Sequence, residues 1–539
     1  MTREDVRRAE RIELVLAPRP EGVSLQRWLY DELRAAILTG RLAPGARLPS
    51  TRDLAARFGL SRGTVLGAFA QLDAEGYLAG AVGRGSYVAA ELPDRRIDSG
   101  VRGGRSADSD RGDPHERQSL KKHDGRPSPR AANTRGDDAG HRHQPAVTLS
   151  ARGRLLARSA FQLSGRSIPA RAFRASQPDL DAFPFDLWAR LAAKRTRRTQ
   201  RDLLGDGEAQ GYRPLREAIA AYVGMSRGIA CSADHVVVLG SVQQAIDLSA
   251  RLLLDPGDVA WIEDPGYLGA RFVFEAAGAR VVGVPVDAGG LDVEWARRHA
   301  PDARLAFVTA GRQAPLGPPL ALERRLSLLE WARSRGAVVI EDDYDSEYRF
   351  AGHPLAALKS LDDDGHVIYC GTFSKLLFPA LRTAYAIVPD RLVEPFVTAL
   401  SLTTRHVPLD QQSVLHEFIA DGHFGRHIRR MRVLYGERAE ALAAGVARHL
   451  AGLLEVAPIV AGLDAPAFLP PGTDDNEAVR RAANAGIETR ALSRHAVDRP
   501  APAGLVLGFA SVGVEDIESG LITLARAISP MRRSHGNRG

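Results

Sequence analysis

The feature that most restricts how this chain can fold is a long stretch, residues 92–148, that contains hardly any large apolar residue. It is rich in Arg, Asp, Gly, Ser and Pro, and such a segment cannot bury enough apolar surface to offset the conformational entropy lost on folding. We therefore predict a flexible, disordered linker over residues 92–150. It divides the 539-residue chain into two folded domains, expected over residues 15–91 and 151–530, and the final SPMRRSHGNRG is expected to be disordered.

The net charge and the positions of the cysteines limit the kinds of binding site that this chain is expected to contain. The formal net charge of +7 and the pI of about 9.6 are compatible with nucleic-acid binding, and equally with a basic proteome background. The two cysteines, Cys231 and Cys370, lie far apart and outside any CxxC pair, so neither a disulfide framework nor a zinc site is expected. No segment approaches the roughly 20 apolar residues of a membrane span, and we expect a soluble, cytoplasmic protein.

The N-terminal domain shows helical periodicity. Apolar residues spaced four apart predict a first helix: Leu25, Leu29, Leu33 and Ile37. Gly40 ends it. Ser50 or Thr51 can cap a second helix that ends at Gly59, and Ser61 can cap a third. The apolar face of that third helix comprises Val65, Phe69 and Leu72.

Two short helices joined by a tight glycine-containing turn make a helix-turn-helix, in which the start of the second helix enters the major groove of DNA. After Gly76, the segments YLAG and SYVAA predict two short strands around AVGRG. This pattern is typical of a β-hairpin wing with a glycine-rich, basic tip.

Residues 23–90 resemble the GntR family of winged-helix regulators, most distinctively in LPSTRDLA, LSRGTV and GRGSYV. The resemblance implies that two arginines reach phosphates or guanine edges and that a hydroxyl and the wing backbone hold the DNA backbone. The residues assigned to DNA in this way are Arg52, Ser61, Arg62, Thr64, Gly83 and Gly85.

The chemistry of these residues agrees with DNA binding. Arginine pairs with guanine O6 and N7 through two parallel hydrogen bonds, and helix N-termini accept phosphate. The alternative for Arg52 and Arg62 is a surface ion pair with Asp53 or Glu75. Two arginines at the caps of adjacent short helices, followed by a wing, favour the DNA interpretation.

In the large domain, the segment AVVIEDDYDSEYRF predicts a strand buried on both faces, Ala337 to Ile340, followed by acidic residues. Open α/β sheets bind ligands at the carboxyl ends of such strands. Asp342 and Tyr344 are two positions apart, so they face the same way on an extended strand end. Coordination of Mg²⁺ by Asp342 and Asp343 is an alternative.

The segment HVIYCGTFSKLLFPALRTAY predicts another strand, from Val367 to Cys370, and then a polar turn. Lys375 in this turn precedes LLF, and an apolar environment lowers a lysine pKa and favours Schiff-base formation. A third segment, VVLGSVQQAIDLSARLLLDPGD, predicts a strand, a small-residue turn and a helix, where backbone N–H groups of Ser241 and Val242 can receive a phosphate.

In combination, these segments resemble fold-type I enzymes that use pyridoxal 5′-phosphate (PLP), and specifically the MocR-type regulators, in which a GntR head is joined to an aminotransferase-like domain. The resemblance covers residues 23 to 528. It implies that Lys375 forms a Schiff base with PLP, that Asp342 pairs with the pyridine nitrogen, and that Tyr344 bonds the phenolic oxygen. Thr372 and Arg382 would hold the phosphate, beside the Ser241 and Val242 amides, and Tyr267 in EDPGY would stack on the ring. Singly, Lys375 is more often a surface lysine and Tyr267 a core residue.

Several positions depart from the family pattern, mainly around the substrate. Three changes fall in TAGRQAPLG, where Pro, His and an aromatic residue are expected, and three replace a tyrosine, an arginine and a histidine elsewhere; in chain order the departures are Asp206, Ala310, Arg312, Ala314, Asp464 and Val506. Val506 stands where aminotransferases bind the substrate carboxylate with arginine. Arg490 or Arg494 is a candidate to substitute for that arginine.

The expected fold is therefore multidomain: an N-terminal α+β winged helix-turn-helix and a C-terminal α/β fold-type I aminotransferase-like domain. The expected function is a PLP-dependent transcription regulator that binds a double-stranded DNA operator as a homodimer and senses PLP, an amine or an amino acid. An active aminotransferase with an attached DNA-binding head is the alternative. A third hypothesis is a DNA-binding protein whose large domain is only a dimerisation scaffold.

Overall fold

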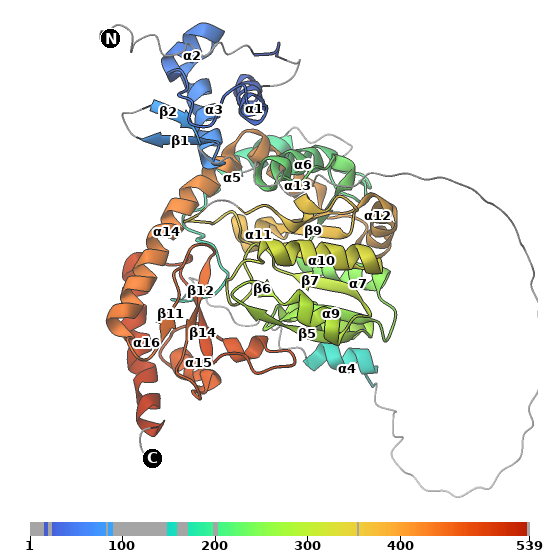
Figure 1. Ribbon diagram of the computed structural model, residues 1–539, viewed down its shortest axis with the longest axis vertical. Helices are drawn as coiled ribbons and strands as arrows, with labels where there is room; N and C mark the ends of the chain where they lie inside the picture. Colours follow the sequence, from blue (N-terminus) through green and yellow to red (C-terminus); the bar gives the residue numbers. More distant parts are fainter. Residues whose placement is uncertain are drawn as a thin grey trace, which may run out of the picture.

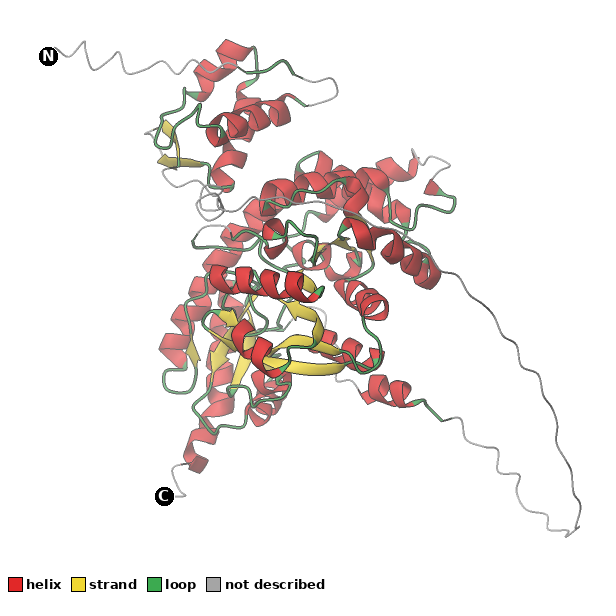
Figure 2. Ribbon diagram, turned by 45° about the vertical axis from the view of Figure 1, so that its right-hand side comes forward, coloured by secondary structure: helices red, strands yellow, loops and turns green. Residues whose placement is uncertain are grey.

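The computed structural model describes residues 16–19, 24–81, 85–89, 148–158, 171–197, 203–352 and 355–535. Most of them form a small N-terminal part, called here the head (residues 24–89), and a large part, called the body (residues 171–535), which can be told apart in Figure 2. Most of the predicted linker, over 92–150, lies outside the described residues. The domain limits at 15–91 and 151–530 stay predictions.

The head contains three helices: α1 (Leu25–Leu38), α2 (Thr51–Phe58) and α3 (Arg62–Ala74). Side-chain caps begin the last two, because the Ser50 hydroxyl accepts a hydrogen bond from the Asp53 N–H (3.2 Å) and the Ser61 hydroxyl accepts one from the Thr64 N–H (3.0 Å). Gly59 ends α2 in the left-handed region at φ 63°, a backbone conformation that glycine adopts easily because it has no Cβ. The tight turn of a helix-turn-helix follows from these three local features.

A two-stranded antiparallel hairpin completes the head. It pairs β1 (Leu78–Ala81) with β2 (Gly85–Val88), and Val88 packs in the same apolar core as Val65 and Leu33. Gly83, predicted at the wing tip, lies outside the described residues. The winged helix-turn-helix predicted from the sequence is confirmed.

The body is built on an eight-stranded sheet (Figure 1). In spatial order its strands are β3 (Val236–Leu239), β10 (Ala384–Ile387), β9 (Val367–Thr372), β8 (Val338–Asp343), β7 (Ala303–Val308), β4 (Val259–Asp264), β5 (Arg280–Asp287) and β6 (Gly290–Leu291). The strands from β9 to β5 are parallel, whereas β10 runs antiparallel to both of its neighbours.

Helices cover both faces of this sheet, which explains the continuous apolar runs of its strands. On one face, alternate strand residues pack against three helices: α7 (Val242–Leu253), α8 (Leu268–Ala277) and α12 (Asp390–Thr404). On the opposite face, the other residues of β4, β7 and β8 pack against α9 (Val293–His299) and α10 (Leu322–Arg335). A third core joins β3, β9 and β10 to α6 (Arg213–Arg227), α13 (Leu409–Ala420) and α14 (His423–His449).

The C-terminal part of the body is a smaller antiparallel sheet, in the order β11 (Glu455–Val456), β12 (Asp464–Phe468), β14 (Gly504–Gly508) and β13 (Arg490–Ala491). It packs with α15 (Asp475–Asn484) and α16 (Val514–His535). This α/β architecture confirms the predicted fold class of the large domain.

The prediction of a disordered tail after residue 528 is wrong in part. Helix α16 continues through Pro530 to His535. The physical reason is that Met531 packs, partly buried, against the main core of the body and anchors this last stretch of helix. No helix within the described ranges has the length and apolar character needed to cross a membrane.

Candidate functional site

Two strands of the main sheet, β3 and β9, end at the edge where β10 begins, and this edge brings four of the predicted residues together. Ala384 of β10 is in register with Leu239 of β3 on one side and with Thr372 of β9 on the other. The turn after Leu239 leads into Ser241, the segment after Thr372 leads into Lys375, and Arg382 precedes Ala384 by two residues. Ser241, Thr372, Lys375 and Arg382 therefore lie along one edge of the sheet.

Lys375 is held in a short helix, α11 (Phe373–Leu376), which is capped by the Thr372 hydroxyl. Its Nζ donates a hydrogen bond to the Ser176 carbonyl oxygen (2.7 Å), and Thr372 is largely buried. The Leu376 carbonyl oxygen is fixed in turn by the Tyr348 hydroxyl at 2.7 Å. The lysine is thus positioned by the interior of the body and is not a mobile surface side chain.

Asp342 lies near the end of β8 and is buried. Its Oδ1 has no hydrogen-bond partner among the described residues. Burial, followed by the negative charges of Asp343, Asp345 and Glu263, raises the pKa of Asp342 to about 8, while Lys375 opposes that shift. An orphaned buried carboxylate oxygen is costly, and a protonated ring nitrogen would satisfy it.

The neighbouring Asp343 points to the other face of the sheet. Its Oδ2 forms an ion pair with Arg227 (2.6 Å) and accepts a hydrogen bond from the Tyr369 hydroxyl (2.8 Å). Asp343 is therefore paired on one face of the sheet, whereas Asp342 Oδ1 has no partner among the described residues on the other, and the two carboxylates do not converge on one point.

Replacing Asp342 by Asn is expected to remove a pH dependence from the stability of the PLP-free protein. Because the folded-state pKa of Asp342 is raised from 3.8 to about 8, the folded chain keeps a proton that the unfolded chain releases, and stability falls as pH rises through that window. The stability difference between wild type and Asp342→Asn should change by up to about 1.4 kcal/mol per pH unit, levelling off above about pH 8. Thermal unfolding of both proteins at several pH values would measure this, and a constant difference would contradict it.

Tyr267 follows β4 and lies beside these groups. Its hydroxyl donates to Gln243 Oε1 at 3.0 Å, and its ring stacks on Phe307 at a centroid distance of 5.9 Å. Burial and the charge of Asp342 raise the pKa of Tyr267, while Arg490 and Arg382 lower it. Tyr267 is thus within electrostatic reach of the carboxylate and of the predicted phosphate arginine.

The sheet edge also offers a cradle for a phosphate. Ser241 caps α7, whose first-turn N–H groups, including that of Val242, have no partner within the helix. A Cβ added to Gly240 would lie 4.0 Å from the Arg382 carbonyl oxygen, so the two turns are adjacent. The exposed Arg382 makes no hydrogen bond or ion pair within the described part of the chain. Orphaned amides and an uncommitted guanidinium at one edge fit a phosphate.

Tyr344 and two of the departures from the family pattern form one buried network. Arg312 Nη1 donates to the Tyr344 hydroxyl oxygen (2.7 Å) and to Asp345 (3.1 Å). Its Nη2 pairs with Asp464 Oδ1 at 3.0 Å, and Asp464 accepts a hydrogen bond from the Ser176 hydroxyl (2.8 Å). Arg312 and Asp464, expected as separate losses, are therefore a single ion pair.

The other departures from the family pattern lie outside this buried network. Asp206 is exposed, and Ala310 is buried in the core between the sheet and α10. The Ala314 N–H donates to the Thr309 hydroxyl at 2.9 Å. Val506 is buried in an apolar cluster with Ala175 and Leu492.

Sequence reasoning missed Ser176, which contacts both Lys375 and Asp464. It lies 199 residues before Lys375 and carries a positive φ of 58°. No local pattern marks it, because its role depends on a contact between distant segments.

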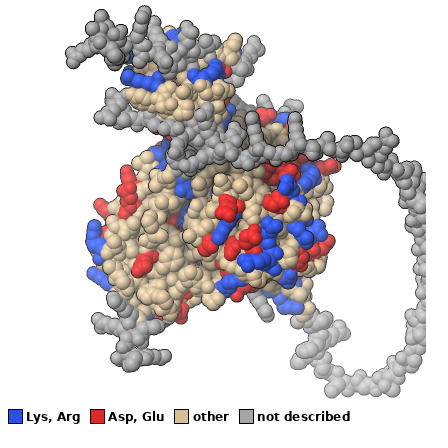
Figure 3. Space-filling view, viewed as in Figure 1, with Lys and Arg blue, Asp and Glu red and all other residues tan. Residues whose placement is uncertain are grey.

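The predicted DNA-contacting side chains lie on the surface of the head. Arg52 and Arg62 are exposed, and neither forms an ion pair with any residue that the structure describes. Asp53, one proposed partner, instead accepts a hydrogen bond from the Ser50 hydroxyl, and Glu75 bonds Tyr30 and Gln71. Figure 3 shows basic side chains on the head, while acidic and basic groups alternate on the visible face of the body.

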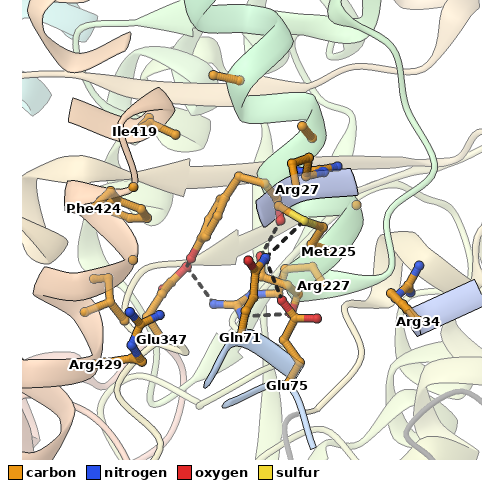
Figure 4. Close-up of a pocket in the computed structure, with 18 of the residues that line it drawn as sticks. Arg27, Arg34, Gln71, Glu75, Met225, Arg227, Glu347, Ile419, Phe424 and Arg429 are labelled. Carbon is orange, nitrogen blue, oxygen red and sulfur yellow. Dashed lines mark hydrogen bonds and ion pairs between the residues drawn. The ribbon is translucent and has the colours of Figure 1, made fainter. Parts of the chain in front are cut away.

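A cavity of about 1640 Å³ is lined by residues of both the head and the body (Figure 4). Across it, Gln71 Nε2 of α3 donates to Met225 Sδ of α6 at 3.4 Å. Glu75 borders the cavity, and burial raises its pKa to about 7. Lys375, Asp342 and Tyr267 are absent from its lining, so it is a separate hollow from the sheet-edge site.

Known proteins match this chain in both parts. Residues 25–88 match the gntR family of bacterial regulatory proteins, and residues 174–455 match aminotransferase class I and II. The chain is 37% identical over 522 residues to a probable rhizopine catabolism regulatory protein MocR of Rhizobium meliloti, covering 97% of each. It is 28% identical to the pyridoxine biosynthesis transcriptional regulator PdxR of Corynebacterium glutamicum, covering 96% of this chain and 99% of the relative.

Among solved structures, the body resembles LysN, the α-aminoadipate aminotransferase of Thermus thermophilus, crystallised with N-(5′-phosphopyridoxyl)-L-leucine. The TM-score is 0.62 at 28% sequence identity, and the match covers 67% of this chain and 92% of LysN.

Proposed function

This chain belongs to the MocR-type regulators, gntR-family proteins with an aminotransferase-like domain, and we propose that it controls transcription in response to PLP or to an amine that condenses with PLP. It is a DNA-binding transcription regulator, and its cofactor is PLP. The observation that carries the proposed sensing role is the buried, partnerless Oδ1 of Asp342 on the same strand-end surface as Lys375.

When bound, PLP supplies an aldehyde that condenses with primary amines and a ring that withdraws electrons. Lys375 is the amine proposed to hold it, since Ser176 fixes its Nζ at the sheet edge. Asp342 Oδ1 would keep a proton on the ring nitrogen. Ser241, Val242, Thr372 and Arg382 would bind the phosphate, and Tyr267 would pack on the ring.

Tyr344 is proposed to donate its hydroxyl hydrogen to the phenolic oxygen of the cofactor. Arg312 Nη1 already occupies a lone pair of the Tyr344 oxygen at 2.7 Å, so the phenol hydrogen is left to point elsewhere. Arg312 thus acts as a positioning residue for that proton.

DNA contact is proposed for the exposed Arg62 at the start of α3 and for the exposed Arg52 of α2. It is also proposed for Ser61, Thr64 and the wing backbone at Gly83 and Gly85. Replacing Arg62 by alanine should weaken operator binding by about 1–3 kcal/mol, roughly 5- to 150-fold, if Arg62 contacts a base. A titrated gel shift would measure the loss. Arg251→Ala, which removes an exposed arginine of the body paired with Asp247, is the matched control and should leave affinity unchanged.

The sensing role is tested by a gel shift on the DNA upstream of the protein's own gene, with and without PLP and a panel of amines. A ligand can shift DNA affinity only if it binds two arrangements of the protein with different affinity. We expect PLP, alone or with one amine, to change the affinity. Identical affinity under all conditions would overturn the sensing role and leave a constitutive operator-binding protein.

We further propose that the protein acts as a homodimer, in which two heads contact two half-sites of the operator. Because its target is chromosomal DNA, we propose that it works in the cytoplasm. An active aminotransferase is not favoured, since the chain matches full-length regulators over nearly all its length and Val506 stands where a carboxylate-binding arginine is expected.

A further inference from the structure

The cavity that the head and the body line together has a wall of arginines on the side of the body. Arg426, Arg429 and Arg432 of α14 line it, and they are three positions apart, so they are neighbours on one helix face. Arg349, two positions after Glu347, lines the same cavity. The Arg432 Nε donates to the Glu347 carbonyl oxygen at 3.0 Å, which holds the segment with Arg349 against α14. We call these four residues the cavity arginines.

The cavity arginines have no anionic partner of their own. Within the described part of the chain, none of them forms an ion pair, and the guanidinium groups of Arg349 and Arg429 make no hydrogen bond either. Figure 4 shows Arg429 at the edge of the cavity, beside Glu347. Arg426 donates to the Asp421 carbonyl oxygen at 2.9 Å and contacts His423. The hydrogen bonds of this wall therefore go to neutral acceptors.

The carboxylates that border the cavity have other partners or lie in solvent. Glu347 pairs with Arg227 at 2.7 Å and accepts a hydrogen bond from the Tyr222 hydroxyl at 2.8 Å. Glu75, on the head, accepts one from Gln71 Nε2 at 3.3 Å. Three further acids of the lining are exposed, and none of these described residues forms an ion pair with a cavity arginine: Asp73, Glu217 and Asp421. The positive charge of the wall is thus not balanced by the protein itself.

The pKa values agree with an unbalanced positive charge. Burial and the charges of Arg426 and Arg432 lower the pKa of Arg429. Burial also lowers the pKa of Arg349 and of Arg432, although nearby acidic groups oppose the shift in both. An anion placed between these groups would favour their charged forms and remove part of the electrostatic cost.

The head closes the cavity without adding uncommitted cations. Arg27 of α1 pairs with Asp31 at 2.8 Å, and the Arg34 Nε donates to the Tyr77 hydroxyl at 3.1 Å. The volume of about 1640 Å³ is larger than most small-molecule pockets, which measure about 300–1,000 Å³. It equals a cube with edges of about 12 Å, no wider than the major groove alone, so a DNA duplex does not fit inside.

We propose that this cavity is a second ligand site, in which Arg349 and Arg429 bind a small anion that carries phosphoryl groups and at least two negative charges. A phosphoryl group places up to about two charges on three acceptor oxygens, so it can balance several guanidinium groups within a small volume. The planar fork of arginine matches phosphate oxygens through two parallel hydrogen bonds. The site goes beyond the proposed function, because it is separate from the PLP site.

The test is a calorimetric titration of sodium pyrophosphate into the full-length protein saturated with PLP. The phosphate of PLP fills the cradle at the sheet edge, so that pyrophosphate does not bind there. The variants are Arg429→Ala, Arg349→Ala and Arg429→Lys. Arg251→Ala, which removes an exposed arginine of the body, is the matched control. Citrate, which carries only carboxylates, is the comparison anion.

Wild type should bind one pyrophosphate per chain, more tightly than citrate. Arg429→Ala and Arg349→Ala should each weaken this binding by about tenfold or more, since a charge-assisted hydrogen bond is lost. Both variants should fold, because neither guanidinium group bonds to another described residue. Arg429→Lys should recover part of the affinity, and Arg251→Ala should match wild type.

Four outcomes would overturn this assignment. They are no detectable binding of pyrophosphate by wild type, tighter binding of citrate than of pyrophosphate, an unchanged affinity in both alanine variants, and an equal loss in Arg251→Ala. A loss in Arg62→Ala with none in Arg429→Ala would place the anion on the surface proposed for DNA, and would overturn it as well.

Discussion

Replacing Lys375 by alanine is expected to abolish the visible absorbance of PLP-loaded protein, because no other amine among the described residues occupies the sheet edge where the cofactor is proposed to bind. The effect should be complete, since a covalent bond to the aldehyde needs a primary amine at that place. Absorbance spectra after incubation with PLP and desalting would measure it.

The folded state should survive this substitution. The lost hydrogen bond from Lys375 to the Ser176 carbonyl is worth only about 1 kcal/mol. Lys194→Ala is the matched control, because Lys194 is a partly exposed lysine of α5 (Phe185–Arg197) that pairs with Glu417. A visible band that persists in Lys375→Ala, or disappears in Lys194→Ala, would show that the cofactor is held elsewhere.

The second large effect is expected at Arg312. Replacing it by methionine leaves Asp345 and Asp464 buried without their shared cation, and breaking a buried ion pair from one side costs about 3–5 kcal/mol. The loss should grow as pH rises. Without the guanidinium the pKa of both carboxyls increases, so the folded state keeps protons that the unfolded state releases.

Denaturant unfolding followed by tryptophan fluorescence would measure this loss, because four of the five tryptophans report on the body: Trp188, Trp261, Trp295 and Trp331. Arg324→Met is the control, since Arg324 pairs with the exposed Asp287 and should cost less than about 1 kcal/mol. Arg312→Met combined with Asp464→Asn should cost less than the sum of the single changes. Additive losses would show that the two side chains do not stabilise one another.

The sequence predicted well those features that depend on neighbours in the chain. The caps at Ser50 and Ser61 and the left-handed Gly59 follow from local hydrogen bonding and backbone sterics, so the helix-turn-helix was predictable residue by residue. The position of Asp342 and Lys375 at one edge of the sheet was predictable because each follows an apolar strand, and parallel strands bring their carboxyl ends to one edge.

Contacts between distant segments were not predictable in this way. Arg312 and Asp464 lie 152 residues apart, and each was interpreted as the loss of a family residue. Only the fold shows that a buried cation and a buried anion compensate each other, because no local pattern specifies which distant partner meets a buried charge. The placement of Arg490 beside Val506 likewise depends on strand register in an antiparallel sheet.

Helix α3 connects the surface proposed for DNA with the body. Gln71, near its end, touches Met225 of the body, and Arg62 begins it at the surface proposed for DNA, nine residues or about 13 Å along the axis. When a rigid helix tilts about a contact near one end, its opposite end moves furthest. A rearrangement of α6 would therefore displace the end of α3 that is proposed to contact DNA, without the head having to detach.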